Sequence, residues 1–276
     1  MTLRSLAPVV DAHMVLVAAL AVAGTYACRR AGLIVDLPAD LVGIAVIFPV
    51  VFSIASAYTR REEALRSFAA IKADAASLYY AHRDWTAAGR DLRDNGAILV
   101  EELLEAIGAY FGAPPEGQRL ALERVYAAFS AISASYRGLL DAGVSRSEIS
   151  RLGAYLRELM TEFEAMRNFA HYRTPITLRS FSRFFLTIFP LLFTPYFALV
   201  GYPEHLAIGY VFAFTYGVVL VGLDNVQEEL ENPYDGLGPD DLRLTIAHEF
   251  IGLLTTTQPE DGPTLEPRTV RTSTRV

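Results

Sequence analysis

Bulky apolar side chains recur every four residues in the stretch LVGIAVIFPVVFSIASAYTRR, which covers residues 41–61. Five positions share this spacing: Asp40, Ile44, Phe48, Phe52 and Ser56. Residues four apart lie on one face of a helix, so the pattern predicts a helix with a stripe that runs from a carboxylate through apolar groups to a hydroxyl. Such a stripe fits packing against lipid or other helices, or the wall of a pore whose apolar constriction gates by dewetting.

Apolar runs elsewhere in the chain predict three further membrane spans. The four spans expected are 10–28, 41–58, 183–202 and 206–223. A bilayer requires about 20 apolar residues in a helix, and the first run reaches this length only when residues before Met14 are included. A cleaved signal peptide is the rival interpretation of that run, but no clear cleavage site precedes Cys28 and a second apolar run follows closely. The spans therefore predict two antiparallel hairpins, in residues 1–60 and 174–225.

Between the hairpins, residues 61–173 alternate charged and apolar positions at helical spacing, which predicts helices outside the membrane. The segments expected are 60–84, 90–112, 116–140 and 146–171, the first continuing directly from the second span. Ser145 and Glu148 form a capping box at the start of the last segment, and Pro175 ends it.

After the fourth span, residues 226–258 read as an acidic loop followed by a helix, and residues 259–276 as a disordered tail. The acidic residues concentrated there are Glu228, Glu229, Glu231, Asp235, Asp240 and Asp241. Calcium requires six to eight oxygen ligands, and the EF-hand pattern is absent. A solvated turn is therefore favoured over a cation-binding loop.

Arginines flank the inner ends of the predicted spans, which sets their orientation. Arg60, Arg61 and Arg66 follow the second span, whereas the turn at 202–205 contains no Lys or Arg. We expect a multi-pass protein of the inner (plasma) membrane with both termini in the cytoplasm. Arg29 and Arg30, in the first outer loop, are the exception to this rule.

The composition agrees with a membrane protein, since 52% of the residues are hydrophobic and 20% are charged. A net charge of −7 argues against nucleic-acid binding, which needs an excess of Lys and Arg. The single cysteine, Cys28, excludes an internal disulfide. The five histidines show no metal-ligand spacing, and no phosphate loop or nucleophile elbow is visible, so we expect no enzyme and no cofactor.

One motif resembles a known family. The residues Glu231-Asn232-Pro233-Tyr234, followed by Asp240-Asp241-Leu242, resemble the E-N-P-F-G and D-D signature of the bestrophins. The stretch from Gly43 to Phe52 with the later Arg61, and Thr174-Pro175-Ile176, are similar to bacterial bestrophins. The resemblance covers most of residues 35–250.

The resemblance implies an all-α, four-span homopentameric channel whose pore is surrounded by the second spans of five copies. Its partners would be four further copies of the chain, membrane lipid and permeant ions. The family's apolar neck falls on Ile44, Phe48 and Phe52, with Asp40, Ser56 and Arg60 at the pore mouths. A second, cytosolic constriction falls on Ile149.

The chain departs from the family at two places. The Trp-x-Gly-Ser stretch expected before the first span is missing, and the acidic loop lacks the unbroken Asp run of the calcium-activated animal members. A calcium site on Glu231, Asn232, Asp235, Asp240 and Asp241 is therefore disfavoured.

The sequence does not determine whether the permeant ion is an anion or a cation. A ring of Asp40 carboxylates would enrich cations, and Arg60 at the inner end would attract anions. We expect a chloride-type anion channel, since the family is mostly described as anion-conducting. A cation-selective homologue and a non-conducting membrane scaffold are the alternatives.

Overall fold

The computed structural model describes residues 10–85, 90–172, 176–231, 233–234 and 241–256, and within them it contains helices and no strand. The helices are α1 (Ala12–Ala31), α2 (Ala39–Asp84), α3 (Arg90–Phe111), α4 (Gln118–Asp141), α5 (Arg146–His171), α6 (Ile176–Leu192), α7 (Thr194–Leu199), α8 (Leu206–Glu231) and α9 (Ala247–Thr256). The expected all-α class is confirmed.

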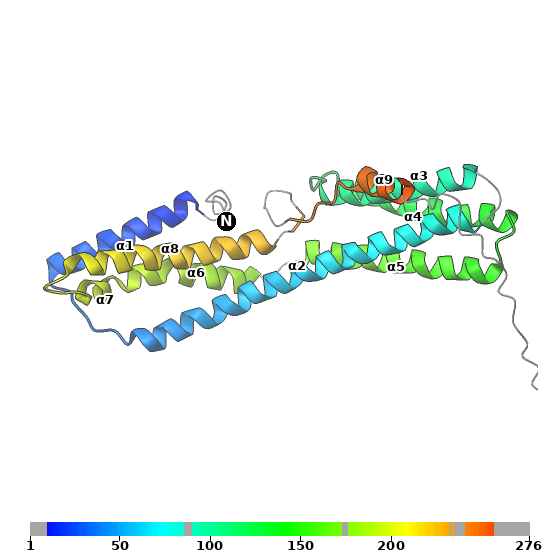
Figure 1. Ribbon diagram of the computed structural model, residues 1–276. Coiled ribbons are helices and arrows are strands. Elements are labelled where there is room, and N and C mark those ends of the chain that lie inside the picture. The colour runs from blue at the N-terminus through cyan, green and yellow to red at the C-terminus, as the bar shows by residue number, and fades with distance from the viewer. Residues whose placement is uncertain (1–9, 86–89, 173–175, 232, 235–240, 257–276) are drawn as a thin grey trace, which may run out of the picture.

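The molecule is elongated and consists of two helical bundles placed end to end (Figure 1). We call α1, α6, α7, α8 and the first half of α2 the membrane bundle. The distal bundle contains the second half of α2 with α3, α4, α5 and α9. Helix α2 has 46 residues, a length of about 70 Å at 1.5 Å per residue, and so it belongs to both bundles. This confirms the prediction that the second span continues as a helix into the next region.

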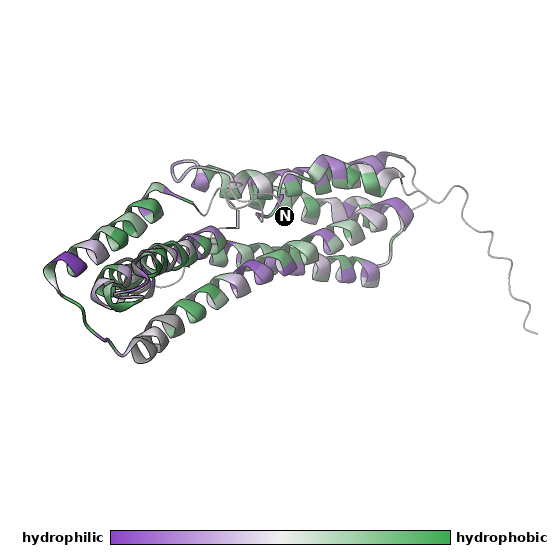
Figure 2. Ribbon diagram, turned by 60° about the vertical axis from the view of Figure 1, so that its left-hand side comes forward, coloured by the Kyte–Doolittle hydropathy of each residue, from purple (hydrophilic) through white to green (hydrophobic). Residues whose placement is uncertain are grey.

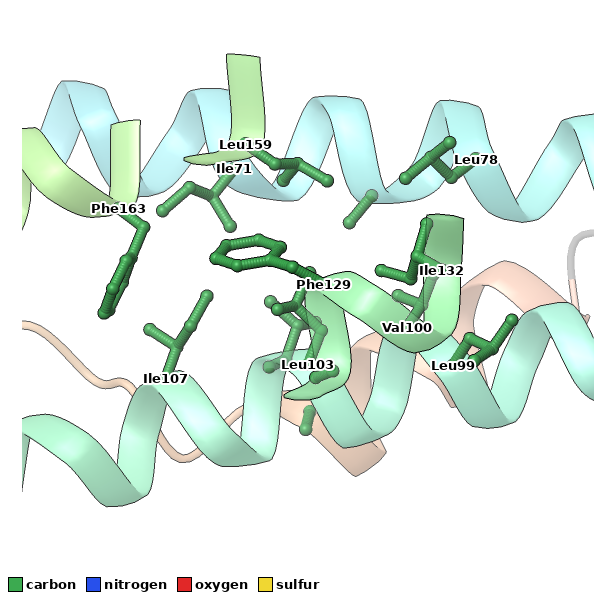
Figure 3. Close-up of a cluster of buried hydrophobic side chains, with 14 of the residues drawn as sticks. Ile71, Leu78, Leu99, Val100, Leu103, Ile107, Phe129, Ile132, Leu159 and Phe163 are labelled. Atoms are coloured by element: carbon green, nitrogen blue, oxygen red, sulfur yellow. The ribbon is translucent and has the colours of Figure 1, made fainter. Parts of the chain in front are cut away.

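The predicted helices of the distal bundle agree with α3, α4 and α5 to within two residues at each end. At the start of α5, the Ser145 hydroxyl accepts a hydrogen bond of 3.3 Å from the Glu148 backbone N–H, which is one half of the predicted capping box. The Glu148 carboxylate lies 3.1 Å from Nη1 of Arg151. Figure 3 shows apolar side chains from α2, α3, α4 and α5 meeting in the core of this bundle. Ile71 from α2, Leu103 from α3 and Phe163 from α5 are fully buried there. Apolar burial of this kind is the main stabilising term of a bundle.

Three described helical segments are long and apolar enough to cross a bilayer: Ala12–Ala31, Arg179–Leu199 and Ala207–Leu230. Large apolar side chains on their outer faces are exposed, among them Leu16, Phe184 and Phe212. Figure 2 colours the ribbon by hydropathy, and much of these helices is green, that is, hydrophobic. The segments indicate a membrane protein. The expected span 41–58 stays a prediction, because most side chains in its first half lie outside the described part.

Two details of the helix ends were refined by the structure. A one-residue turn at Phe193 separates α6 from α7, because Pro195 in the first turn of α7 has no N–H to donate to the preceding turn. Arg179–Leu199 is still one segment of membrane length, in agreement with a third span that is kinked at a proline. Helix α8 extends to Glu231, about two turns beyond the expected end of the fourth span. Glu228 and Glu229 therefore lie on a helix and not in a loop.

Among the described residues, α1 packs along other helices of the membrane bundle rather than along α2, and the first hairpin stays a prediction. Helix α1 contacts α8, α7 and α6, and α2 contacts α8 and α6 in the membrane bundle. A close approach of two backbones explains the pairing of α1 with α8. A Cβ added at Gly217 would lie 2.9 Å from the Cα of Ala18, so only glycine fits at this crossing.

Candidate functional site

One face of α2 in the membrane bundle is covered by the chain's own helices, and the opposite face is not. Val50, Ser53 and Ala57 are buried on the covered side. Phe48 and Phe52 are 60% and 65% exposed on the other side, and their ring centroids are 5.8 Å apart. The described helices of this chain therefore leave an aromatic pair on α2 without a covering partner.

The uncovered face continues beyond the two phenylalanines. Val51, Ala55, Ser56 and Thr59 are all exposed on it, so it carries apolar, small and hydroxyl side chains without a charge in this stretch. The Thr59 hydroxyl donates a hydrogen bond of 2.9 Å to the Ala55 carbonyl, and this bond lowers the polarity of the face. A face of this composition is suited to lipid, to another chain or to a narrow pore.

Some expected pore residues lie outside the described part. The side chains of Asp40 and Ile44 are not described, although the backbone at both positions belongs to α2. Ile44 and Phe48 are four positions apart, so an α-helix would place Ile44 near the same stripe. The membership of Asp40 and Ile44 in the stripe stays a prediction.

Arg60, expected at a pore mouth, is engaged by the chain itself. Its Nη2 donates a hydrogen bond of 2.7 Å to the carbonyl of Phe169 near the end of α5, and the side chain is half-buried. Arg60 lies twelve positions after Phe48, which corresponds to a net rotation of about 120° around the helix. Arg60 thus ties α2 to α5, a role that sequence spacing could not indicate because its partner lies 109 positions away.

The bestrophin-like motif holds the end of α8 to the distal bundle. The Tyr234 ring is buried and stacks on Phe111 with centroids 4.4 Å apart, and its hydroxyl donates to the Met166 carbonyl at 3.3 Å. Burial raises the pKa of Tyr234, so the hydroxyl remains a donor. The Leu242 N–H donates to the Pro233 carbonyl at 2.8 Å, which joins the two described parts of the motif.

Most of the acidic positions considered for a cation site lie outside the described part, so that site is not tested. The side chain of Glu231 and the residues Asn232, Asp235 and Asp240 lie outside the described part, and Asp241 is half-buried. Within the described residues, no group of three or more His, Cys, Asp or Glu side chains could hold a metal ion. Ile149, expected at a cytosolic constriction, is half-buried and packs against the apolar core of the distal bundle.

An ionic cluster between α6 and α8 escaped the sequence reasoning. Arg183 Nε lies 3.6 Å from Asp224 Oδ2, and Arg183 Nη1 lies 3.8 Å from Glu228 Oε2. The Asp224 side chain is only 7% exposed. The sequence contained one feature that could have indicated this cluster, an ionisable residue inside an apolar run. In a membrane helix such a residue faces a partner within the bundle.

Comparison with solved structures identifies the fold. A bacterial bestrophin homolog from Klebsiella pneumoniae carrying a point mutation is 18% identical, with a TM-score of 0.74, and the match covers 89% of this chain and 98% of that one. A structure of the bacterial bestrophin homolog from Klebsiella pneumoniae that was solved by zinc phasing is 17% identical, with a TM-score of 0.72, and the match covers 90% of this chain and 98% of that one. A further point mutant of that homolog is 16% identical, with a TM-score of 0.76, over 88% and 96%.

The sequence itself matches no model of a known protein family and no curated protein. The chain thus has the fold of bacterial bestrophin homologs, and the resemblance inferred from the sequence is confirmed for the fold.

Proposed function

We propose that this protein is a bestrophin-type ion channel in which five copies surround one pore and α2 of each copy lines it. The observation that carries the proposal is the exposed pair Phe48 and Phe52, on a face of α2 that the chain's described helices leave uncovered. In a ring of five copies, each phenylalanine would be repeated around the axis. The pair would then become two stacked apolar rings, with Ile44 as a third.

Such a neck would control ion flow without binding ions tightly. A narrow apolar ring is a poor host for water, so it blocks ions until it is wetted or widened. The edges of aromatic rings carry partial positive charge and the Ser56 hydroxyl is a donor, and both features favour anions. We therefore propose small monovalent anions such as chloride as the permeant ions. A ring of Asp40 carboxylates would favour cations instead.

We also propose that the protein lies in the plasma membrane with both termini in the cytoplasm. The arginines at the inner ends of the spans support this orientation. We further propose that the channel works without a cofactor. Chelation of calcium in a bilayer recording is then expected to leave the current unchanged.

Two measurements on the purified protein test the proposal. Light scattering in detergent is expected to give the mass of five chains. In planar bilayers, the double variant Phe48→Ala and Phe52→Ala is expected to conduct more current than wild type, because shortening both side chains widens and wets the neck. Phe212→Ala is the matched control, since Phe212 is also exposed but lies on α8.

The outcomes separate the alternatives. A monomer or dimer that carries no current would favour a non-conducting scaffold, and an equal response of the neck variant and the Phe212 control would remove the neck assignment. The reversal potential in asymmetric NaCl decides the sign of the ion. A potential near the sodium equilibrium value would replace the anion proposal with a cation-selective channel.

A further inference from the structure

A groove of about 440 Å³ runs along the outer face of α6. The residues that line it are Ser180, Arg183, Phe184, Thr187, Ile188 and Leu191. The polar members lie mainly at the end of α6 that adjoins the distal bundle, and the apolar members follow toward the middle of the membrane bundle. The groove is therefore polar at one end and apolar along most of its length, like a phospholipid.

Arg183 at the polar end has hydrogen-bonding capacity to spare. Its side chain is 51% exposed, and its distances to Asp224 and Glu228, 3.6 Å and 3.8 Å, are those of ion pairs without a hydrogen bond. A guanidinium has five N–H donors, and among the described residues Arg183 makes no hydrogen bond with any of them. An arginine at a membrane boundary in this state is suited to bind a phosphate.

The two carboxylates near Arg183 differ in what they can do. Asp224 is buried, so it holds the guanidinium near the groove as a fixed counter-ion. The Glu228 side chain is 61% exposed, and its pairing with Arg183 at 3.8 Å is weakened by solvent. A phosphate can replace Glu228 beside Arg183 without leaving a buried charge unpaired.

We propose that this groove binds one anionic phospholipid in the leaflet where α6 begins. The phosphate is bound by the Arg183 guanidinium and the Ser180 hydroxyl, and an acyl chain lies along Phe184, Ile188 and Leu191. Basic sites at the ends of membrane helices commonly bind anionic headgroups. The proposal goes beyond ion conduction and does not depend on it, because lipid binding is measured without current.

Native mass spectrometry of the detergent-purified protein tests this. With palmitoyl-oleoyl phosphatidylglycerol as the probe, wild type is expected to retain the lipid more strongly than it retains the corresponding phosphatidylcholine. Arg183→Gln is expected to lower the affinity for phosphatidylglycerol about fivefold, the effect of one arginine near a charged headgroup. Arg30→Gln is the control, because Arg30 lies at the opposite end of the bundle over the ring of Tyr26.

A second variant covers the case in which Arg183→Gln fails to fold because Asp224 loses its counter-ion. Ile188→Trp fills the apolar part of the groove and leaves the ionic cluster intact, so it is expected to lower retention of both lipids. Unchanged retention in Ile188→Trp would contradict the proposal. If glycerol phosphate displaces all of the bound phosphatidylglycerol, the site binds free anions and not a lipid. If Ile188→Trp loses the oligomer, the groove is an interface between copies of the chain. Either result overturns the lipid assignment.

Discussion

Nη2 of Arg29, near the end of α1, donates a hydrogen bond of 3.0 Å to the carbonyl of Val200, which follows α7. Its Nε donates to the carbonyl of Ala198 at 3.1 Å, and its guanidinium carbon lies 4.6 Å from the ring centroid of Tyr210. The last carbonyls of a helix lack partners within the helix, and a cation complements the negative end of its dipole. Arg29 therefore caps α7, which gives a structural reason for an arginine at this end of the membrane bundle.

Replacing Arg29 should destabilise the membrane bundle. Arg29→Gln is expected to lower the free energy of unfolding by about 1.5–3 kcal/mol, because hydrogen bonds from a charged donor to buried carbonyls are lost. Thermal unfolding followed by circular dichroism in detergent measures the change. Arg30→Gln, in which an exposed arginine beside Tyr26 is removed, should change the midpoint little. Equal midpoints for the two variants would contradict the capping role.

The Tyr234 ring should matter more to stability than its hydroxyl. Tyr234→Ala removes a buried ring that stacks on Phe111 and is expected to cost about 3–5 kcal/mol. Tyr234→Phe keeps the ring and loses only the hydrogen bond to Met166, which costs about 1 kcal/mol. Denaturant unfolding of the three proteins compares the two effects. A phenylalanine variant as unstable as the alanine variant would show that the hydroxyl dominates.

Two glycines on helices should respond to alanine in opposite directions. A Cβ at Gly96 would lie 2.6 Å from the Cβ of His82, an atom fixed by the backbone of α2, so Gly96→Ala is expected to destabilise by about 1–3 kcal/mol. Gly153 on α5 has no atom within 4 Å of such a Cβ, and Gly153→Ala should stabilise by about 0.5–1 kcal/mol. The thermal unfolding midpoints of the two variants, compared with that of wild type, show whether each change destabilises or stabilises the protein. A tolerated alanine at position 96 would mean that α2 and α3 pack less closely.

His82 should make stability depend on pH. The ring is 2% exposed, with Nδ1 2.8 Å from the Leu78 carbonyl and Nε2 3.0 Å from the Ser135 hydroxyl. Burial lowers the pKa of His82 below its ordinary value of 6.5, so the folded protein keeps the ring neutral while the unfolded chain takes up a proton. The stabilising contribution is then complete above pH 6.5 and decreases as the pH falls toward the folded-state pKa.

The measurement is the unfolding midpoint between pH 7 and pH 5. Wild type is expected to lose stability over this interval, and His82→Gln is expected to lose less, because the substituted side chain does not titrate. Parallel curves for wild type and His82→Gln would contradict the assignment.

Local features of the sequence were sufficient to predict much of the helical architecture. Charge and apolar spacing gave α3, α4 and α5 to within two residues, and Ser145 marked the start of α5. These features were predictable because helix formation and capping depend on residues three or four positions apart. Pro195 was visible in the sequence as the site of a kink, and in the structure it lies in the first turn of α7, directly after the turn at Phe193 that separates α7 from α6.

The candidate site was predictable in part. The spacing of Phe48 and Phe52 placed them on one stripe, and the structure shows them side by side and uncovered by the chain's described helices. The role of Arg60 in tying α2 to α5 and the pairing of Arg183 with Asp224 were not predictable. Each depends on a partner about 40 or more positions away, which spacing along the chain does not specify.

The sequence by itself determined that the chain is helical, that it contains apolar segments of membrane length, and which residues share a stripe on α2, because these properties repeat with the period of a single helix. Only the tertiary structure decided which helices pack together and which face of α2 remains open. The close contact of Ala18 with Gly217 pairs α1 with α8, and α2 is covered on the side of Ser53 and Ala57. Packing depends on the shapes of surfaces from distant parts of the chain, and this leaves Phe48 and Phe52 exposed.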